Sequence, residues 1–256
     1  MRVPEREMRP TWPGLLTVKG VHGADDPKYA YGGRNEGTTG DVTANTVTID
    51  MANAADLVEE VYGGMASAED NTGAVDHNTA NMKNGTTHLL YGGYTFGKGA
   101  VTNNKVQFDG GTSTGYVAGG YLDNTDSTVE MTGNKVVFTN GTAAELAGAD
   151  SNGKGKLRGN TVDFGGAAST AEILRGALAE NEAAVEGNGV TMTAGTAESV
   201  YGSATYTTDP SNNLVGGNGR AEKNTVAITG GTIGTTMRAA ASAAMDAMSP
   251  SSRLTV

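Results

Sequence analysis

The stretch from Leu89 to Tyr121, "LLYGGYTFGKGAVTNNKVQFDGGTSTGYVAGGY", carries two Gly pairs and, between them, an Asn followed by the alternating segment "KVQF". Val106 and Phe108 alternate with polar residues, which is the period-2 pattern of a strand with one buried face. Glycine supplies positive φ in turns at little cost. The stretch therefore predicts a short strand between two Gly-containing turns, and its two similar ends indicate a repeat.

The pattern "Asn, any residue, apolar, any residue, apolar" occurs seven times in the chain. Both apolar positions hold Val, Ala, Ile, Met or Phe in every copy, and the spacings between successive asparagines are 33, 26, 30, 26, 28 and 36 residues. The seven asparagines are Asn45, Asn78, Asn104, Asn134, Asn160, Asn188 and Asn224.

Two further signals recur with the asparagines. An apolar residue followed by a segment such as "YGG" or "AGG" lies 12 to 16 residues after each Asn, and a short extended segment such as "AVTNN" precedes most of them. Each period therefore predicts three short strands separated by turns. A β-solenoid tolerates the variation in period, because extra residues loop outward at a corner without disturbing the stacked strands.

The fold class predicted from this repeat is all-β: a parallel, right-handed β-helix or β-solenoid of about seven coils of about 28 residues. The coils are expected to occupy residues 31–237. Residues 1–30 are expected to be an irregular N-terminal segment with a partial capping coil at "LLTVKG", and residues 238–256 a helix-prone or unstructured tail.

Stacked coils predict specific contacts inside the solenoid. We expect Val106, Phe108 and Val117 of one coil to contact their counterparts in the next coil, which are Val136, Phe138 and Leu146. Successive coils are expected at about 4.8 Å, the spacing of paired strands.

The invariant polar position has two interpretations. Seven stacked asparagines predict an internal ladder whose amides bond to neighbouring coils. Asparagine is also common in turns with positive φ, which explains the same column without a ladder. Both interpretations give the asparagines a structural role.

Composition limits the class of function. The formal net charge of −10 disfavours nucleic acid as a partner, because phosphate recognition needs clustered Lys and Arg. The absence of Cys removes thiol catalysis and Cys-based zinc sites. No run of apolar residues is long enough for a transmembrane helix, no signal peptide is recognisable at the start of the chain, and no motif indicates a cofactor.

One surface is a candidate for binding. A column of tyrosines recurs at the second signal, and a corner insertion at 203–220 is the longest in the repeat. A partial aromatic ladder along one edge offers ring faces to sugars, although stacking between coils is an alternative use of the same rings. The candidate residues are Tyr31, Tyr62, Tyr91, Tyr201, Tyr206 and Asp209.

No catalytic or metal site is expected. Acids such as Asp123 and Asp126 are scattered among predicted corners, where a solvated acidic surface explains them. The three histidines have no metal-ligand spacing, and no Ser-centred nucleophile motif is present. The sequence therefore favours a protein that is not an enzyme.

Units with "VYGG" and "NxVxI…GGT" resemble the Gly-rich passenger repeats of bacterial type V autotransporters and related large surface adhesins, over about Tyr31 to Met237. The resemblance implies a non-enzymatic scaffold and binding surface displayed outside a Gram-negative-type cell. It implies host or bacterial glycans or proteins as partners and a monomeric segment of a larger protein. The family has no shared catalytic motif that these positions match.

Two alternatives remain at this stage. A polysaccharide-active β-helix enzyme, or a degenerate relative, predicts three or more carboxylates within reach of one another across a groove. A structural fibre or tail-spike segment predicts a trimer in solution.

Overall fold

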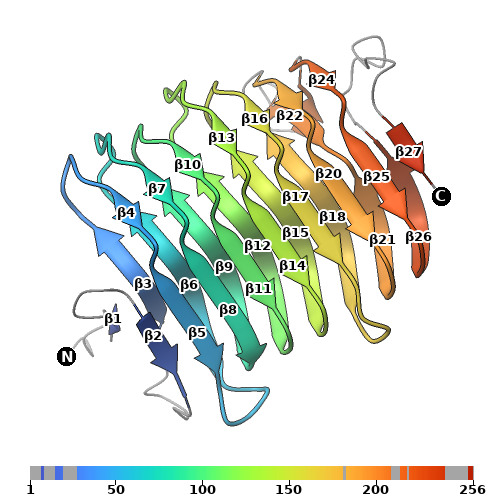
Figure 1. Cartoon of the computed structure of the whole chain (residues 1–256), viewed down its shortest axis with the longest axis horizontal. Coiled ribbons are helices and arrows are strands. Elements are labelled where there is room, and N and C mark those ends of the chain that lie inside the picture. Colours follow the sequence, from blue (N-terminus) through green and yellow to red (C-terminus); the bar gives the residue numbers. More distant parts are fainter. Residues whose placement is uncertain are drawn as a thin grey trace.

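The computed structural model describes residues 7–8, 15–19, 28–180, 183–208, 214–217, 219–239 and 253–255. These residues form strands and turns, with no helix among them. The strands stack as three parallel sheets around one long axis, so the chain advances coil by coil from its N-terminal to its C-terminal end (Figure 1). The predicted parallel β-solenoid is confirmed.

Sheet A contains the longest strands, and its outward face carries the candidate site described below. In spatial order its strands are β1 (Glu7–Met8), β3 (Tyr29–Asn35), β6 (Leu57–Ala66), β9 (Thr86–Thr95), β12 (Thr112–Leu122), β15 (Thr142–Ser151), β18 (Thr170–Ala179), β21 (Thr196–Tyr201) and β26 (Thr232–Arg238). In addition, β22 (Ala204–Thr208) pairs with β18 and, antiparallel, with β23 (Leu214–Gly216).

Sheet B contains the "NxVxF" segments that reveal the repeat. Its strands are β2 (Leu15–Val18), β5 (Thr46–Asp50), β8 (Thr79–Asn84), β11 (Lys105–Phe108), β14 (Lys135–Phe138), β17 (Thr161–Phe164), β20 (Gly189–Met192), β25 (Thr225–Ile228) and β27 (Arg253–Thr255).

Sheet C contains two-residue strands, one just before each repeat asparagine. Its strands are β4 (Val42–Thr43), β7 (Val75–Asp76), β10 (Val101–Thr102), β13 (Met131–Thr132), β16 (Leu157–Arg158), β19 (Val185–Glu186) and β24 (Ala221–Glu222). Seven such strands match the seven repeats of the sequence.

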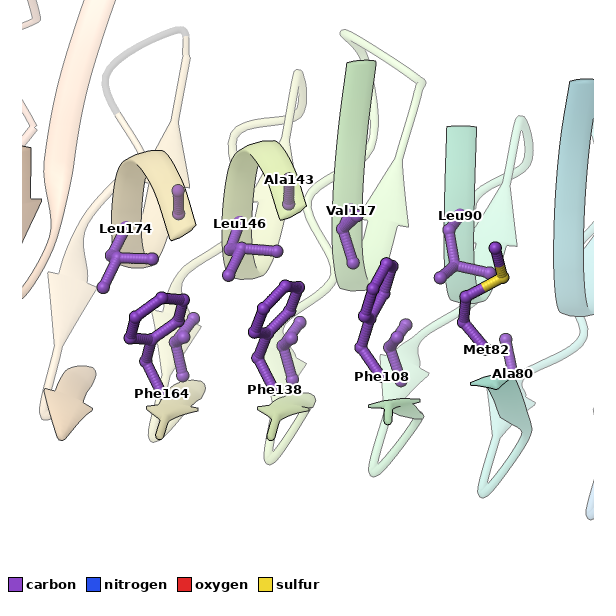
Figure 2. Close-up of a cluster of buried hydrophobic side chains, with 14 of the residues drawn as sticks. Ala80, Met82, Leu90, Phe108, Val117, Phe138, Ala143, Leu146, Phe164 and Leu174 are labelled. Atoms are coloured by element: carbon purple, nitrogen blue, oxygen red, sulfur yellow. The ribbon is translucent and has the colours of Figure 1, made fainter. Parts of the chain in front are cut away.

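The register between coils is the predicted one. Val106 pairs with Val136 and Phe108 with Phe138 in sheet B, while Val117 pairs with Leu146 in sheet A. The rings of Phe108 and Phe138 stack at 4.5 Å between centroids, so identical core residues lie above one another along the axis (Figure 2). A repeated sequence thus becomes a repeated column of contacts.

The interior holds two cores side by side. The larger lies between the first half of each sheet A strand and sheet B, and contains residues such as Leu90 and Phe108. The smaller lies between the second half of each sheet A strand and sheet C, and contains residues such as Leu122 and Val101. Two narrow cores explain how a chain with 37% hydrophobic residues fills a solenoid.

A column of glycines lies between the two cores. The first Gly of each "YGG"-type pair is kept from Gly32 to Gly202 and is replaced by Ala239 in the last copy, whereas the second becomes Ala149, Ala177 and Ser203 in the later coils. A Cβ on Gly119 would lie 2.4 Å from the backbone N of Lys135 and 2.5 Å from the carbonyl oxygen of Gly148. The first position therefore needs glycine, because two backbones approach there.

The seven asparagines form a continuous ladder beside this column. The Oδ1 atom of Asn134 accepts hydrogen bonds from the backbone N and the Nδ2 of Asn104, at 3.1 Å each. The Nδ2 of Asn134 donates to the carbonyl oxygen of Val101 at 2.9 Å and to Oδ1 of Asn160 at 3.0 Å. Equivalent links join every successive pair from Asn45 to Asn224.

The left-handed bend belongs to the residue before each asparagine. All seven of these residues have φ between 54° and 66°, and none of the asparagines does. Three of the seven are glycines, and the others are Ala44, His77, Asn103 and Lys223. The structure therefore confirms the hydrogen-bonded ladder. The interpretation of the asparagines as residues with positive φ is wrong, because the positive φ belongs to the residue before each of them.

The ends of the chain differ from the expected boundaries. Strand β2 pairs with β5 and places Val18 beside Ile49, so the solenoid begins before residue 31 and the partial N-terminal coil is present. Most of the tail expected to be helix-prone, 240–252, lies outside the described residues. Its described part, Arg253–Thr255, is strand β27 paired with β25, because it continues the sheet B ladder.

Candidate functional site

The outward side of sheet A carries all nine tyrosines of the chain, and we call it the tyrosine face. None of these residues belongs to either interior core. The face comprises Tyr29, Tyr31, Tyr62, Tyr91, Tyr94, Tyr116, Tyr121, Tyr201 and Tyr206 together with the acids and arginines among them, which are Glu60, Asp123, Glu145, Asp150, Glu180, Arg34 and Arg175.

The first tyrosine column is a stack of covered rings. Tyr31 lies 5.2 Å from Tyr62 with an interplanar angle of 10°, and Tyr62 lies 5.5 Å from Tyr91 at 26°. Their exposed fractions are only 4%, 4% and 5%. The expectation that these rings offer faces to a sugar is therefore wrong: each face is covered by the next ring, and stacking between coils is their use.

The column ends in small and charged residues. Register places Ala118, Ala147 and Arg175 after Tyr91, and Tyr201 follows Arg175. The guanidinium of Arg175 lies 5.9 Å from the ring centroid of Tyr201 and pairs with Glu145 of the preceding coil. The first column therefore carries an ion pair in the C-terminal half of the face and stacked rings in the N-terminal half.

A second column runs beside the first and was missed by the sequence analysis. Tyr94, Tyr121 and Asp150 occupy equivalent positions on consecutive coils. The rings of Tyr94 and Tyr121 are parallel within 3° at 5.1 Å. The sequence does contain a signal for this column. The fourth residue of each Gly-pair segment is Tyr in "YGGY" and "AGGY" and Asp in "AGAD".

Carboxylates hold the tyrosine hydroxyls of this face. Tyr94 donates to Oδ2 of Asp123 at 2.8 Å, Tyr62 donates to Glu60, and Tyr206 donates to Glu180. Burial, together with these acceptors, raises the pKa of each of the three phenols far above its ordinary value. The acids at these positions thus act as fixed acceptors, and the interpretation of Asp123 as a merely solvated corner residue is wrong.

Among the residues that the structure describes, Asp150 is the buried acid whose pKa departs most from its ordinary value. Its exposed fraction is 5%. Burial raises its pKa to about 7, and the nearby carboxylates of Glu180 and Asp123 add to the rise. Near neutral pH a large share of Asp150 is therefore a neutral acid.

Two hollows open on this face. The first, of about 400 Å³, is lined by Tyr29, Tyr31, Arg34, Glu60, Tyr62, Met65 and Phe96. The second, of about 420 Å³, is lined by Ser67, Glu69, Phe96, Asp123, Asn124, Thr125 and Asp126. Because Phe96 lines both, the hollows adjoin, and we call them together the Phe96 groove. Each is within the size range of small-ligand sites.

The remaining predicted site residues lie elsewhere. Tyr201 and Tyr206 are half-buried at the C-terminal end of the tyrosine face. Asp209 lies outside the described residues, as do residues 210–213 between β22 and β23. The corner insertion that was expected to be a loop forms this antiparallel pair, with Tyr206 opposite Gly216.

The described residues were also compared with what a metal centre and a membrane-spanning helix require. They include no group of three or more His, Asp or Glu side chains arranged to hold a metal ion. They also include no helix with the length and apolar character needed to cross a bilayer.

Comparison of the chain with family models, with curated proteins and with solved structures finds no match.

Proposed function

We propose that this chain is a non-enzymatic solenoid segment of a bacterial surface adhesin, in which the tyrosine face is the binding surface. The observation that carries the proposal is the collection of all nine tyrosines, and of both hollows described above, on one outward face. The tyrosines of the first column pack on one another outside the two interior cores, and the hollows open beside them. Exposed or half-exposed aromatic and carboxylate groups that gather on one face are typical of recognition sites.

The rest of the surface supports the same assignment. The outward column of sheet B runs Thr48, Asn81, Gln107, Val137, Asp163, Thr191 and Ala227, and it has neither the same residue type on two consecutive coils nor a cluster of one charge. Binding is therefore assigned to sheet A, and sheets B and C act as its support.

Retention on surfaces coated with glycans or with cells tests this function. Beads that carry the full chain should be retained, and Phe96→Ala should reduce retention because Phe96 lines both hollows. Leu15→Ala is the matched control, since Leu15 is an apolar side chain 69% exposed on sheet B and lines neither hollow. Equal loss in both variants, or no retention of the wild type on any surface, would contradict the proposal.

A polysaccharide-active enzyme is the second candidate, and one observation favours it. The criterion set by the sequence analysis, three carboxylates at one groove, is met by Glu69, Asp123 and Asp126. Asp150 adds an acid whose pKa is raised to about 7, the range of a general acid. Asp150, however, is 5% exposed and lines neither hollow, which is why binding is the leading proposal.

Release of reducing ends from a panel of polysaccharides separates the two candidates. The binding proposal predicts no release by the full chain between pH 5 and pH 8. Release that is lost in Asp150→Asn or Asp123→Asn, with the fold retained, would establish the enzyme instead.

A further inference from the structure

We infer that the Phe96 groove binds an oligosaccharide that carries free amino groups. This inference rests on the proposed function and names the ligand class of the same face. It is carried by the position of Phe96, the fixed polar lining of the groove, and the uncompensated carboxylates beside the ring.

The groove follows the axis of the solenoid. Ser67, Phe96 and Asp123 occupy the same position on three consecutive coils, since the backbone N of Phe96 bonds to the oxygen of Ala66 and that of Asp123 to the oxygen of Thr95. Coils rise by about 4.8 Å. An extended chain laid along the axis would therefore meet a hydroxyl, an aromatic ring and a carboxylate in succession.

The polar lining is held in place before any ligand arrives. Asp123 accepts from Tyr94 at 2.8 Å and from Nδ2 of Asn152 at 2.8 Å. The Nδ2 of Asn124 donates to the carbonyl oxygens of Phe96 and Glu69, at 2.9 and 3.2 Å, and its Oδ1 accepts from the backbone N of Asp126 at 3.1 Å. A prearranged site loses less entropy when a ligand binds.

The charge of the second hollow is negative and only partly compensated. Asp126 pairs with Lys154 at 3.3 Å, and Lys98 pairs with Asp70 at 3.0 Å beside the hollow. Within the part of the chain that the structure describes, Glu69 and Asp123 have no ion pair. Two such carboxylates beside an aromatic ring favour an ammonium group, through charge-assisted hydrogen bonds and a cation–π contact.

A saccharide fits the groove better than a basic peptide. The strands beneath it, β6, β9 and β12, each pair with a neighbour on both sides, so no sheet edge is open to an added peptide strand. Recognition must use side chains. Ser67 and Thr125 line the groove with hydroxyls that exchange hydrogen bonds with other hydroxyls, as a polyhydroxylated ligand requires.

Calorimetry with three tetrasaccharides tests the inference on the full chain. The probes are the tetramer of glucosamine, the tetramer of N-acetylglucosamine and the tetramer of galacturonic acid. We expect the glucosamine tetramer to bind at least about tenfold more tightly than the acetylated one, because the acetylated tetramer cannot form the charge-assisted hydrogen bond of an ammonium group and one such bond changes affinity by about that factor. The acidic tetramer should not bind, and added salt should weaken the glucosamine complex because its charges are partly exposed.

Variants locate the site. Glu69→Gln, Asp123→Asn and Phe96→Ala should each weaken glucosamine tetramer binding by about tenfold or more. Asp163→Asn is the matched control, since Asp163 is a half-exposed acid on sheet B, and it should bind like the wild type. Thermal unfolding of each variant confirms that the fold is retained.

Each contrary outcome has a distinct meaning. Equal binding of the glucosamine and acetylated tetramers, or binding of the acidic tetramer alone, overturns the amino-sugar inference and leaves a glycan-binding function standing. Binding that survives all three groove variants overturns the site. Tetralysine serves as a fourth probe, and its binding in place of any saccharide would overturn the inference in favour of a basic peptide. No binding of any probe, together with no retention of chain-coated beads on cells, overturns the proposed function as well.

Discussion

The asparagine ladder and the tyrosine face are both columns of residues stacked from coil to coil, yet they differ in one respect. The ladder repeats one residue seven times, whereas the columns of the face change from tyrosine to alanine, aspartate or arginine along the axis. A ladder amide bonds to its own kind above and below, so every copy constrains the next. The outward columns have no such constraint, and this freedom is what a binding surface needs.

The largest expected effect comes from breaking the ladder. Asn134→Ala should lower the free energy of unfolding by about 3 kcal/mol, because the buried N and Nδ2 of Asn104 and the oxygen of Val101 lose their partner. Urea denaturation measures the change. Asn81→Ala, on the outward column of sheet B, is the control and should cost less than about 1 kcal/mol. Equal effects would contradict a structural role specific to the ladder.

A second test concerns the glycine column beside the ladder. Gly119→Ala should cost about 2 kcal/mol or more, because its Cβ would meet the backbone N of Lys135 and the oxygen of Gly148. Gly120→Ala should cost less, since the next coil has Ala149 at the equivalent position. The thermal midpoints of the two variants give the order, and the reverse order would refute the close backbone approach as the reason for the glycine kept from Gly32 to Gly202.

The tyrosine face predicts a dependence of stability on pH. Because the folded-state pKa of Asp150 is raised to about 7 from an ordinary 3.8, the folded protein holds a proton that the unfolded chain has lost between those values. Stability should therefore fall as pH rises from about 4 to about 7 on account of this group. The groups around Asp150 are Tyr116, Asp123, Glu180 and the backbone of Ser151.

Asp150→Asn isolates this contribution. It should raise the free energy of unfolding at pH 8 by about 2 kcal/mol and change it little at pH 4, because the amide mimics the neutral acid. Thermal unfolding at the two pH values measures both. Destabilisation at pH 8 would mean that the ionised carboxylate is required, and would contradict the assignment of Asp150 as a neutral buried acid.

The smallest effect concerns the bend before each asparagine. Ala44 has a φ of 57°, which an L residue adopts at a cost and glycine adopts freely. Ala44→Gly should therefore stabilise the protein by about 0.5 kcal/mol after the backbone entropy of glycine is deducted. Gly159→Ala should destabilise it by about 1 kcal/mol through φ alone, since its Cβ would meet nothing within 4 Å. Chemical denaturation measures the free energy of unfolding of each variant and shows whether Ala44→Gly raises it and Gly159→Ala lowers it.

Much of the scaffold was predictable from the sequence. Strand positions, the parallel register and the stacking of Phe108 on Phe138 follow from a repeat whose inward residues alternate with period 2. The partial N-terminal coil follows in the same way, because Val18 precedes Ala30 by the same number of residues as Ile49 precedes Val61.

The candidate site was only partly predictable, for a physical reason. At the Gly pair two adjacent residues, such as Gly119 and Gly120, both approach other parts of the solenoid closely. The alternation of inward and outward residues fails at that point. Outward residues beyond it, such as Tyr121 and Asp150, are therefore not found by counting every second residue along the strand. A column in correct register, such as Tyr31, Tyr62 and Tyr91, still does not reveal that neighbouring rings cover its faces.

The central claim is that binding lies on the variable outward face of sheet A while the ladder carries the fold. Backbone amide NMR of the full chain during titration with the glucosamine tetramer tests it most directly. We expect shifts confined to the segments that line the Phe96 groove, at 29–34, 60–65, 67–69, 96 and 123–126, with none along sheet B. Shifts along the outward column of sheet B, or binding seen by calorimetry without shifts in the groove, would contradict it.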